Sequence, residues 1–404
     1  MAAAISFLGL LVMLVLAWLC SVDRRSMNWR LIISGVALEL LLGLILLWTP
    51  AGQESYRAAG RFITLINQWS DAGAEFVFGE GIRHSPFAFS VLPVIVFTAS
   101  LTAILFYLGV LQWIVKVMAR IMVWVMDTSG AESLAAAANV FVGMTEAPLV
   151  IRPYLASMTR SEIMALMTSG MATIAGSVMA AYAMMLAKVG AEPGHLLAAS
   201  ILSAPAALVI AKIMVPEKED SLTKGTVRVV VPRQDVNLLD AACRGASEGL
   251  KLALNVGAML VAFVGLVAMV NWFLAGLPHL GGQPITLERI LGYLCAPLAL
   301  VMGVPWDDCV EVGMLLGKKT VLNEFLAYMD LVAMKDQLSP RSFIIATYAL
   351  CGFSNLGSIA VLIGGLSALE PSRRADFARY GFRSMIGGNL AAFMTGTVAG
   401  IFHP

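Results

Sequence analysis

The sequence predicts an all-α, polytopic membrane protein with inverted repeats, two re-entrant helical hairpins and discontinuous transmembrane helices. Its composition is the first reason, because 59% of the 404 residues are hydrophobic and only 13% are charged, whereas soluble domains carry about 25% charged residues. The second is a series of long apolar runs. The third is a pair of glutamate-centred segments, each too short to cross a bilayer twice. The net charge of +1 argues against nucleic acid as a partner.

Eight apolar runs are long enough for spanning helices, which need about 20 apolar residues. They cover residues 2–20, 30–49, 88–115, 161–189, 196–214, 250–275, 341–369 and 381–402. The first run has no basic segment before it, and "DRRSMNWR" follows it instead, so we expect a retained helix and not a cleaved signal peptide. Residues 53–85 and 114–127 mix charged with bulky apolar residues, which predicts helices that lie along the membrane interface.

The basic loops predict the orientation of the chain. Arg24, Arg25 and Arg30 follow the first run and indicate a cytoplasmic loop, with the N-terminus outside. Counting onward puts the longest polar segment, about 212–251, and the segment 370–379 on the cytoplasmic side, and the C-terminus outside. Among the strongly basic loops only "MKDQLSPRS" falls on the other side.

This count requires two segments, about 129–157 and about 304–334, to enter and leave the membrane by the same face. Each is apolar and centred on a glutamate, Glu146 in "GMTEAP" and Glu324 in "VLNEFL". We expect re-entrant hairpins, whose non-helical tips are tolerated at membrane depth only inside protein or beside a water-filled cavity. The alternative, that each glutamate merely pairs with a nearby cation, is weaker because both occupy matching places and buried charges in membranes mark pathways.

The two halves of the chain share one plan. In each, an in-plane helix leads to a glutamate-tipped hairpin and then to a long span interrupted by small and hydroxyl residues, "GMATIAGSV" at 170–178 and "CGFSNLGSIAV" at 351–361. The first hairpin starts inside and the second outside, so the repeat is inverted. Inverted repeats with broken helices are typical of secondary transporters whose substrate site lies near the midplane of the membrane.

The interrupted spans contain the residues most suited to ligand binding. Close packing of helices explains small residues equally well and stays open for Gly170, Gly176 and Ser177. It does not explain Asn355, whose amide needs partners in a dry setting. An unwound segment frees backbone carbonyls that can coordinate a cation. Together with Asn139, the oxygens of "ATIAG" would make a site suited to sodium.

Two stretches of the chain carry a family resemblance. "NVFVGMTEAPLVIRPYLASMTRSE" with "MATIAGSV" in the first half, and "NEF" followed by "GFSNLGSIA" in the second, resemble the concentrative nucleoside transporters. The resemblance covers almost the whole chain, in the compact bacterial form of eight spans. It implies a sodium-coupled nucleoside importer of the bacterial cytoplasmic membrane. It also implies a homotrimer in which a mobile transport domain moves like an elevator against an outer scaffold.

On this resemblance we divide the chain into four parts. Residues 1–115 are mainly scaffold helices with an interfacial helix, and residues 116–214 form the first transport-domain repeat. Residues 215–275 hold a cytoplasmic loop and a scaffold helix, and residues 276–404 form the second transport-domain repeat.

The resemblance also implies the site residues. Those expected to bind the ribose hydroxyls are Glu324, Asn355 and Ser358, and those lining the same pocket are Phe353 and Val178. The tip of the first hairpin is expected to meet the nucleobase through Met144, Thr145 and Glu146. The sodium ligands implied are the side chain of Asn139, the carbonyl of Val142, the hydroxyl of Thr173 and the carbonyl of Ile174.

Two positions depart from the family pattern. Met144 stands where well-studied members have a glutamine that bonds a pyrimidine base, and its sulfur is only a weak acceptor. We therefore expect a shifted base preference, towards purines or modified nucleosides. Thr173 stands where serine is usual, and it keeps the hydroxyl that the cation site needs.

Three other functions stay open at this stage. Proton coupling is the nearest, because a membrane-buried carboxylate could carry a proton. A passive channel would need an open pore, which paired closed hairpins argue against. An intramembrane enzyme could use two carboxylates for acid–base chemistry, but the sequence offers no nucleophile or metal set beside them.

Overall fold

The computed structural model describes residues 2–79, 87–225, 235–277 and 284–403, and every regular element within them is helical. The helices of the first half, in chain order, are α1 (Ala2–Leu19), α2 (Trp29–Gly43), α3 (Pro50–Phe78), α4 (Phe87–Tyr107), α5 (Val110–Met126), α6 (Gly130–Asn139), α7 (Ala147–Val150), α8 (Arg160–Ala172), α9 (Gly176–Ala187) and α10 (Gly194–Met214). Those of the second half are α11 (Leu238–Leu274), α12 (Leu287–Met302), α13 (Cys309–Val321), α14 (Glu324–Ala333), α15 (Pro340–Ala349), α16 (Leu356–Leu369) and α17 (Arg374–Phe402). Short 3₁₀ or π turns complete the set: η1 (Leu44–Trp48), η3 (Arg152–Ser157), η4 (Trp306–Asp308) and η5 (Pro371–Arg373).

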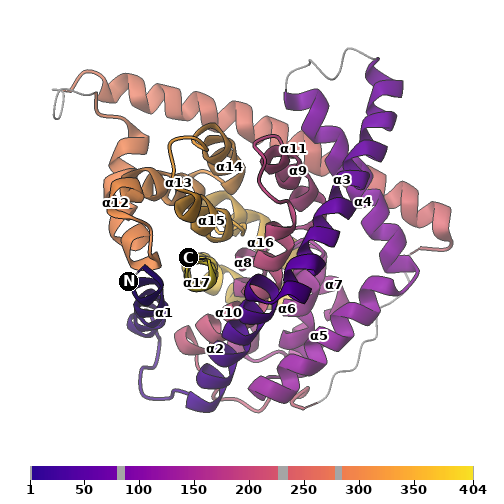
Figure 1. Cartoon of the computed structure of the whole chain (residues 1–404). Helices are drawn as coiled ribbons and strands as arrows, with labels where there is room; N and C mark the ends of the chain where they lie inside the picture. The colour runs from indigo at the N-terminus through magenta and orange to yellow at the C-terminus, as the bar shows by residue number, and fades with distance from the viewer. Residues whose placement is uncertain (1, 80–86, 226–234, 278–283, 404) are drawn as a thin grey trace.

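Several helices of the described chain are long and apolar enough to cross a membrane. The five that qualify alone are Trp29–Trp48, Arg160–Ala187, Gly194–Met214, Leu238–Leu274 and Pro371–Phe402. The bent pair of α4 and α5 makes a sixth, and α1 and α16 are shorter apolar helices. In Figure 1 the broken helices and α17 lie near the middle of the molecule, and the long α11 crosses its outside. The polytopic helical membrane fold predicted from the sequence is confirmed.

Some predicted boundaries are wrong. The run at 88–115 is not one helix, because α4 ends at Tyr107 and the chain turns by 74° into α5. Gly109 makes this turn with a φ of +82°, a left-handed conformation that glycine adopts without steric cost. The helix predicted at 114–127 is α5, which begins earlier, at Val110. The segment predicted to lie at the interface, 53–85, falls on α3, and its residues 80–85 lie outside the described residues.

The polar segment predicted at about 212–251 is shorter than expected. Its residues 226–234 lie outside the described residues, and α11 already begins at Leu238 as one 37-residue helix. The predicted span at 250–275 is therefore only the C-terminal part of α11.

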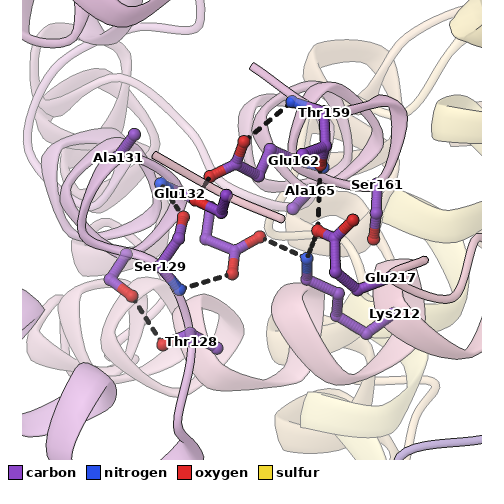
Figure 2. A network of polar contacts seen from close by, with 12 residues as sticks. Thr128, Ser129, Ala131, Glu132, Thr159, Ser161, Glu162, Ala165, Lys212 and Glu217 are labelled. Atoms are coloured by element: carbon purple, nitrogen blue, oxygen red, sulfur yellow. Dashed lines mark hydrogen bonds and ion pairs between the residues drawn. The ribbon is translucent and has the colours of Figure 1, made fainter. Parts of the chain in front are cut away.

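The first hairpin consists of α6, a non-helical tip, α7 and η3. Its start and the following helix α8 carry matching N-terminal signals, "SGAE" and "TRSE", and both form capping boxes at Ser129 and Thr159. Figure 2 shows how these two ends are joined: Lys212 on α10 contacts Glu132 at 2.7 Å and Glu217 at 3.0 Å, and Glu217 accepts a hydrogen bond of 2.9 Å from the Thr159 hydroxyl. Because entry and exit meet at the same end of α10, the hairpin is re-entrant, as predicted.

The second hairpin, η4 with α13 and α14, closes in a similar way. Asp308 at its start accepts hydrogen bonds from the hydroxyls of Ser339 (2.7 Å) and Ser342 (2.6 Å) at the beginning of α15. Arg341 donates to the Gly303 carbonyl at 2.9 Å. The same guanidinium bonds residues near both chain ends, the Ser6 hydroxyl and the His403 carbonyl. Both ends of the described chain therefore lie on the face from which the second hairpin starts (Figure 1).

Both long spans of the repeats are broken, and the two breaks cross each other. The first break, residues 173–175, separates α8 from α9, and the second, residues 350–355, separates α15 from α16. The Phe353 amide donates to the Thr173 carbonyl at 3.2 Å, and the Ser354 hydroxyl donates to the Met171 carbonyl at 2.7 Å. A Cβ on Gly352 would lie 2.9 Å from the carbonyl oxygens of Met171 and Ala172, so glycine allows this close crossing. The discontinuous helices are confirmed.

The buried cation at the base of the first hairpin yields a stability prediction. The side chains of Lys212 and Glu132 are 5% and 2% exposed, and removing one member of a buried ion pair costs roughly 3–5 kcal/mol because the other charge stays behind. Lys212→Met should therefore lower the midpoint of thermal unfolding of the detergent-solubilised protein sharply. The double variant Lys212→Met with Glu132→Gln should recover part of the loss.

The matched control is Lys218→Met, which removes a partly exposed pair with Asp23. Exposed pairs contribute about 0–1 kcal/mol, so this variant should unfold close to the wild type. Equal midpoints for Lys212→Met and the wild type would contradict a structural role for the buried pair.

Candidate functional site

The tip of the second hairpin holds a buried carboxylate between the two repeats. Glu324 is the first residue of α14 and is 5% exposed. Its Oε1 accepts a hydrogen bond of 2.7 Å from the Tyr182 hydroxyl on α9, and its Oε2 accepts one of 3.1 Å from the Asn355 amide at the second break. The carboxylate thus bridges the first repeat and the second. Each carboxylate oxygen offers about two acceptor sites, so further acceptor capacity remains for a ligand.

Asn355 is held in a fixed orientation by its place at the start of α16. Its Oδ1 accepts a hydrogen bond of 2.9 Å from the Ser358 amide, as an N-cap side chain does. Its NH₂ group therefore points to Glu324. The Ser358 side chain is buried in the first turn of the same helix.

The two apolar residues expected at this site lie beside it. Val178 is buried on α9, one turn before Tyr182. Phe353 is half-buried in the second break, and its carbonyl accepts a hydrogen bond from the backbone N–H of Asn355. The structure therefore brings Glu324, Asn355 and Phe353 to one junction.

The tip of the first hairpin lies against different surroundings. Met144 is buried, whereas the side chains of Thr145 and Glu146 are exposed. The Cγ2 atom of Thr145 would lie 3.1 Å from a Cβ on Gly365, so the tip packs on α16 of the other repeat. Among the described residues, Glu146 lines an open cavity whose lining does not include Glu324.

This cavity lies between the first hairpin tip, α4 and the N-terminal part of α11. Its wall includes Ser177 after the first break and three charged residues that sequence analysis treated only as part of a polar loop, Asp235, Arg244 and Glu248. Arg244 donates to Asp235 at 2.7 Å and to Glu248 at 3.0 Å. The four-residue spacing of Arg244 and Glu248, typical of a helix, is the signal that could have extended α11 to this point.

A buried oxygen marks the place expected for a cation. Asn139, the last residue of α6, donates from Nδ2 to the Ala135 carbonyl at 3.0 Å, and its Oδ1 has no hydrogen-bond partner among the described residues. Thr173 donates its hydroxyl hydrogen to the Ser169 carbonyl at 2.9 Å, which leaves the hydroxyl oxygen able to bind a cation. Val142 and Ile174 are also buried, and the Asn139 Oδ1 would lie 3.8 Å from a Cβ on Gly170, near the end of α8. A free carboxamide oxygen beside an unwound segment fits a hard monovalent cation.

The first hairpin tip docks on the first break through its backbone. The Gly176 amide donates to the Phe141 carbonyl at 3.0 Å, and a Cβ on Gly176 would lie only 2.6 Å from that oxygen. No group of three or more histidine, cysteine, aspartate or glutamate side chains within the described ranges could hold a metal ion. The oxygens near this break that are expected to bind the cation belong to a carboxamide, a hydroxyl and backbone carbonyls, all of them neutral, which suits a monovalent cation better than a divalent one.

Three family models match the chain. They are described as the C-terminus of Na⁺-dependent nucleoside transporters, over residues 195–400, the N-terminus of the same transporters, over residues 8–81, and nucleoside recognition, over residues 88–189. The chain belongs to this family, the concentrative nucleoside transporters. The resemblance found in the sequence is confirmed.

Relatives match along nearly the whole chain. An uncharacterized transporter of Bacillus subtilis is 41% identical, over 98% of this chain and 98% of its own length. Solute carrier family 28 member 3 of Eptatretus stoutii is 39% identical, and the rat sodium/nucleoside cotransporter 1 is 40% identical; each match covers 99% of this chain. The chain spans 60% and 64% of the length of these two longer vertebrate proteins.

Solved structures of a transporter named CNTnw share the fold. The protein in an inward-facing, substrate-bound state is 41% identical with a TM-score of 0.91, over 100% of this chain and 98% of that chain. A doubly substituted CNTnw in an outward-facing state gives a TM-score of 0.93 at 41% identity, with the same coverage. CNTnw therefore adopts both of the states that alternating access requires.

One residue that contacts Glu324, Tyr182, was not predicted from the sequence. Tyr182 is fully buried in "VMAAYAMMLA", where its hydroxyl is the only side-chain polar group. A buried phenol needs a hydrogen-bond partner, and its spacing of four residues from Val178 puts both on one face of α9. Those two facts are the signal by which Tyr182 could have been predicted from the sequence.

The unpaired oxygen of Asn139 yields a prediction for sodium binding. Sodium in place of choline should raise the midpoint of thermal unfolding of the wild type, because a ligand that binds only the folded state stabilises it. Asn139→Leu should lose most of this rise. The control Asn67→Leu removes another unpaired amide oxygen, on α3, and should keep it. An undiminished sodium effect in Asn139→Leu would contradict the assignment.

Proposed function

We propose that the protein imports nucleosides by sodium symport, with an elevator-type alternating-access mechanism. The single observation that carries the proposal is the Glu324 carboxylate, buried between Tyr182 of one repeat and Asn355 of the other. A buried carboxylate with acceptor capacity to spare can replace the water that ribose hydroxyls lose on binding. The names of the vertebrate relatives support sodium and nucleoside as the pair of substrates.

The proposed nucleoside site joins both hairpins. Ribose hydroxyls bind Glu324, Asn355 and Ser358, and Phe353 and Val178 form the apolar wall. The nucleobase reaches towards the first hairpin tip at Met144, Thr145 and Glu146. The support for this division is geometric: Glu324 and Asn355 are bonded to each other, and the first tip packs on α16, the helix that starts at Asn355.

Sodium is proposed to bind Asn139, Val142, Thr173 and Ile174. Support comes from the free Oδ1 of Asn139 and from the Thr173 carbonyl, which accepts a hydrogen bond from the Phe353 amide in the nucleoside site. An ion that orders the first break therefore also orders the substrate pocket. One sodium ion moving inward through 100 mV releases about 2.3 kcal/mol, which supports about 50-fold accumulation of substrate.

The packing suggests which parts move. α4 and α11 pack extensively on each other, whereas α1 packs on α17 and α2 packs on α10. We assign α4 and α11 to the scaffold. This agrees with the sequence division, which counts residues 1–115 mainly as scaffold and stays a prediction, and α4 also packs on α9 of the first repeat. α11 exposes large apolar side chains, among them Leu254, Val261 and Trp272, which lipid and neighbouring copies in a homotrimer would cover. The proposed location is the bacterial cytoplasmic membrane with both termini outside.

Uptake into proteoliposomes tests this function directly. With an inward sodium gradient at constant pH, labelled nucleoside should accumulate above its external concentration. Accumulation driven only by a proton gradient would favour the proton-coupled alternative. Equilibration without accumulation would favour a passive channel, and a chemically altered nucleoside would favour an enzyme.

Substitution of Glu324 tests its proposed role in nucleoside binding most directly. Glu324→Gln replaces one acceptor oxygen by an NH₂ group and removes the charge, and hydrogen bonds to charged groups contribute about 1.5–3 kcal/mol each. Loss of two such bonds should reduce uptake by roughly 100-fold or more, while size-exclusion chromatography shows a folded protein. Glu311→Gln, on the same hairpin, is the control. Near-normal uptake by Glu324→Gln would refute the assigned role.

The methionine at the first tip predicts base selectivity. Met144→Gln supplies an amide that can bond a pyrimidine, and one added hydrogen bond is worth about 1 kcal/mol, or roughly fivefold in affinity. Competition of labelled uridine uptake by a nucleoside panel should show a preference for purines or modified nucleosides in the wild type. The variant should shift towards uridine. Uridine as the best wild-type substrate, with no effect of Met144→Gln, would exclude the idea.

A further inference from the structure

A lysine is fully buried in the second hairpin. Lys319 lies on α13 and is 0% exposed. Its Nζ donates to the Ala349 carbonyl at 2.9 Å and lies 5.5 Å from the centre of the Phe393 ring. Within the described part of the chain no carboxylate comes within ion-pair distance of it. The neighbouring Lys318 instead contacts Asp330 at 2.5 Å and Glu288 at 3.8 Å, so the two lysines have different roles.

The partner of Lys319 is the carboxyl end of α15. The last four carbonyls of a helix lack intrahelical donors, and together they carry the negative end of the helix dipole. In α15 the carbonyls of Ala346 and Tyr348 accept hydrogen bonds from backbone amides, and that of Thr347 accepts one of 2.7 Å from the Tyr328 hydroxyl. The fourth, that of Ala349, receives the ammonium group of Lys319. The cation at this helix end is therefore a fixed ammonium group, bonded directly to the Ala349 carbonyl.

The inverted repeat gives this cation a counterpart. In the first repeat α6 packs on α8, and in the second α13 packs on α15, with the break following α8 or α15 in each case. Where α6 ends against α8, Asn139 leaves a buried oxygen unpaired. Where α13 approaches the end of α15, an ammonium group is already bonded. Along the last turn of α13 and along α15, within the described ranges, no buried side-chain oxygen lacks a partner.

We infer that the ammonium group of Lys319 is a tethered cation that takes, in the second repeat, the place of the sodium ion in the first. The second repeat therefore binds no sodium, and the protein moves one sodium ion per nucleoside. This inference rests on the proposed sodium-coupled function. Sodium leaves its site in every cycle, whereas a lysine does not, so the second repeat keeps the end of α15 neutralised in every state.

Counting sodium ions tests the inference. Initial rates of nucleoside uptake by the wild type, measured against sodium with choline as replacement, should give a Hill coefficient near 1, and labelled sodium and nucleoside should enter in equal amounts. Lys319→Asn copies the carboxamide of Asn139 and vacates the ammonium position. Its Hill coefficient should rise towards 2, with two sodium ions per nucleoside and a higher half-saturating sodium concentration.

Three measurements keep the inference open to refutation. Lys319→Arg preserves the charge and should keep one sodium ion, and Lys318→Met, which removes the neighbouring charge, should leave the Hill coefficient unchanged. Thermal unfolding of Lys319→Asn should be shifted upwards by sodium more strongly than that of the wild type. A wild type that moves two sodium ions, or a Lys319→Asn variant with an unchanged sodium response, overturns the inference. A Lys319→Asn variant that stays unfolded at every sodium concentration also overturns the inference, because sodium should bind a vacated cation site and stabilise the folded protein.

Failure of the proposed function looks different. In that case wild-type vesicles do not accumulate nucleoside on a sodium gradient at all. Failure of this inference leaves that accumulation intact and changes only the sodium count or its dependence on Lys319.

Discussion

The structure depends on the hydrogen-bonded crossing of two broken helices. A break inside a membrane exposes backbone donors and acceptors that lipid cannot satisfy, so it persists only where protein supplies partners. Here each break supplies partners for the other, through the Phe353 amide on the Thr173 carbonyl and the Ser354 hydroxyl on the Met171 carbonyl. Asn389 on α17 adds a hydrogen bond of 2.9 Å to the Ser354 carbonyl. Each break therefore takes hydrogen-bond partners from the other, and the second also takes one from α17.

This crossing explains why the polar groups gather where they do. Asn355, the last residue of the second break, caps α16 and directs its side-chain amide to Glu324. The first break is followed by α9, on which the Tyr182 hydroxyl donates to the same carboxylate. The first break also receives the tip of the first hairpin through the bond from Gly176 to Phe141. Each hairpin tip therefore contacts both repeats. A rearrangement at one hairpin tip must therefore also change the contacts of the other hairpin tip.

The repeats share a backbone plan but differ in their polar chemistry. The base of the first hairpin is held by a buried ion pair, Lys212 with Glu132, and the base of the second by Asp308 with serine hydroxyls. The breaks differ too, since one faces an unpaired amide oxygen of Asn139 and the other an ammonium group of Lys319. In the proposed mechanism, a sodium ion from solution takes the cation position in the first repeat, and the ammonium group of Lys319 takes the matching position in the second.

The sequence predicted the glutamate tips and both breaks because polar and small residues stand out in apolar runs. Tyr182 and Lys319 could not be assigned in the same way. Tyr182 is a phenol in an apolar helix, and Lys319 stands beside another lysine. Their roles can be assigned only when the structure shows their partners, Glu324 and the Ala349 carbonyl. The 74° turn at Gly109 was missed for a related reason. Hydropathy continues across the turn, and only backbone geometry divides the run.

If the crossing of the breaks joins the cation site to the nucleoside site, the two ligands must be thermodynamically linked. The most direct measurement is titration calorimetry of the purified protein, with nucleoside titrated at several sodium concentrations and sodium titrated with and without nucleoside. The account predicts that sodium tightens nucleoside binding and that nucleoside tightens sodium binding by the same factor, as linkage requires. Nucleoside affinity that is independent of sodium would contradict it.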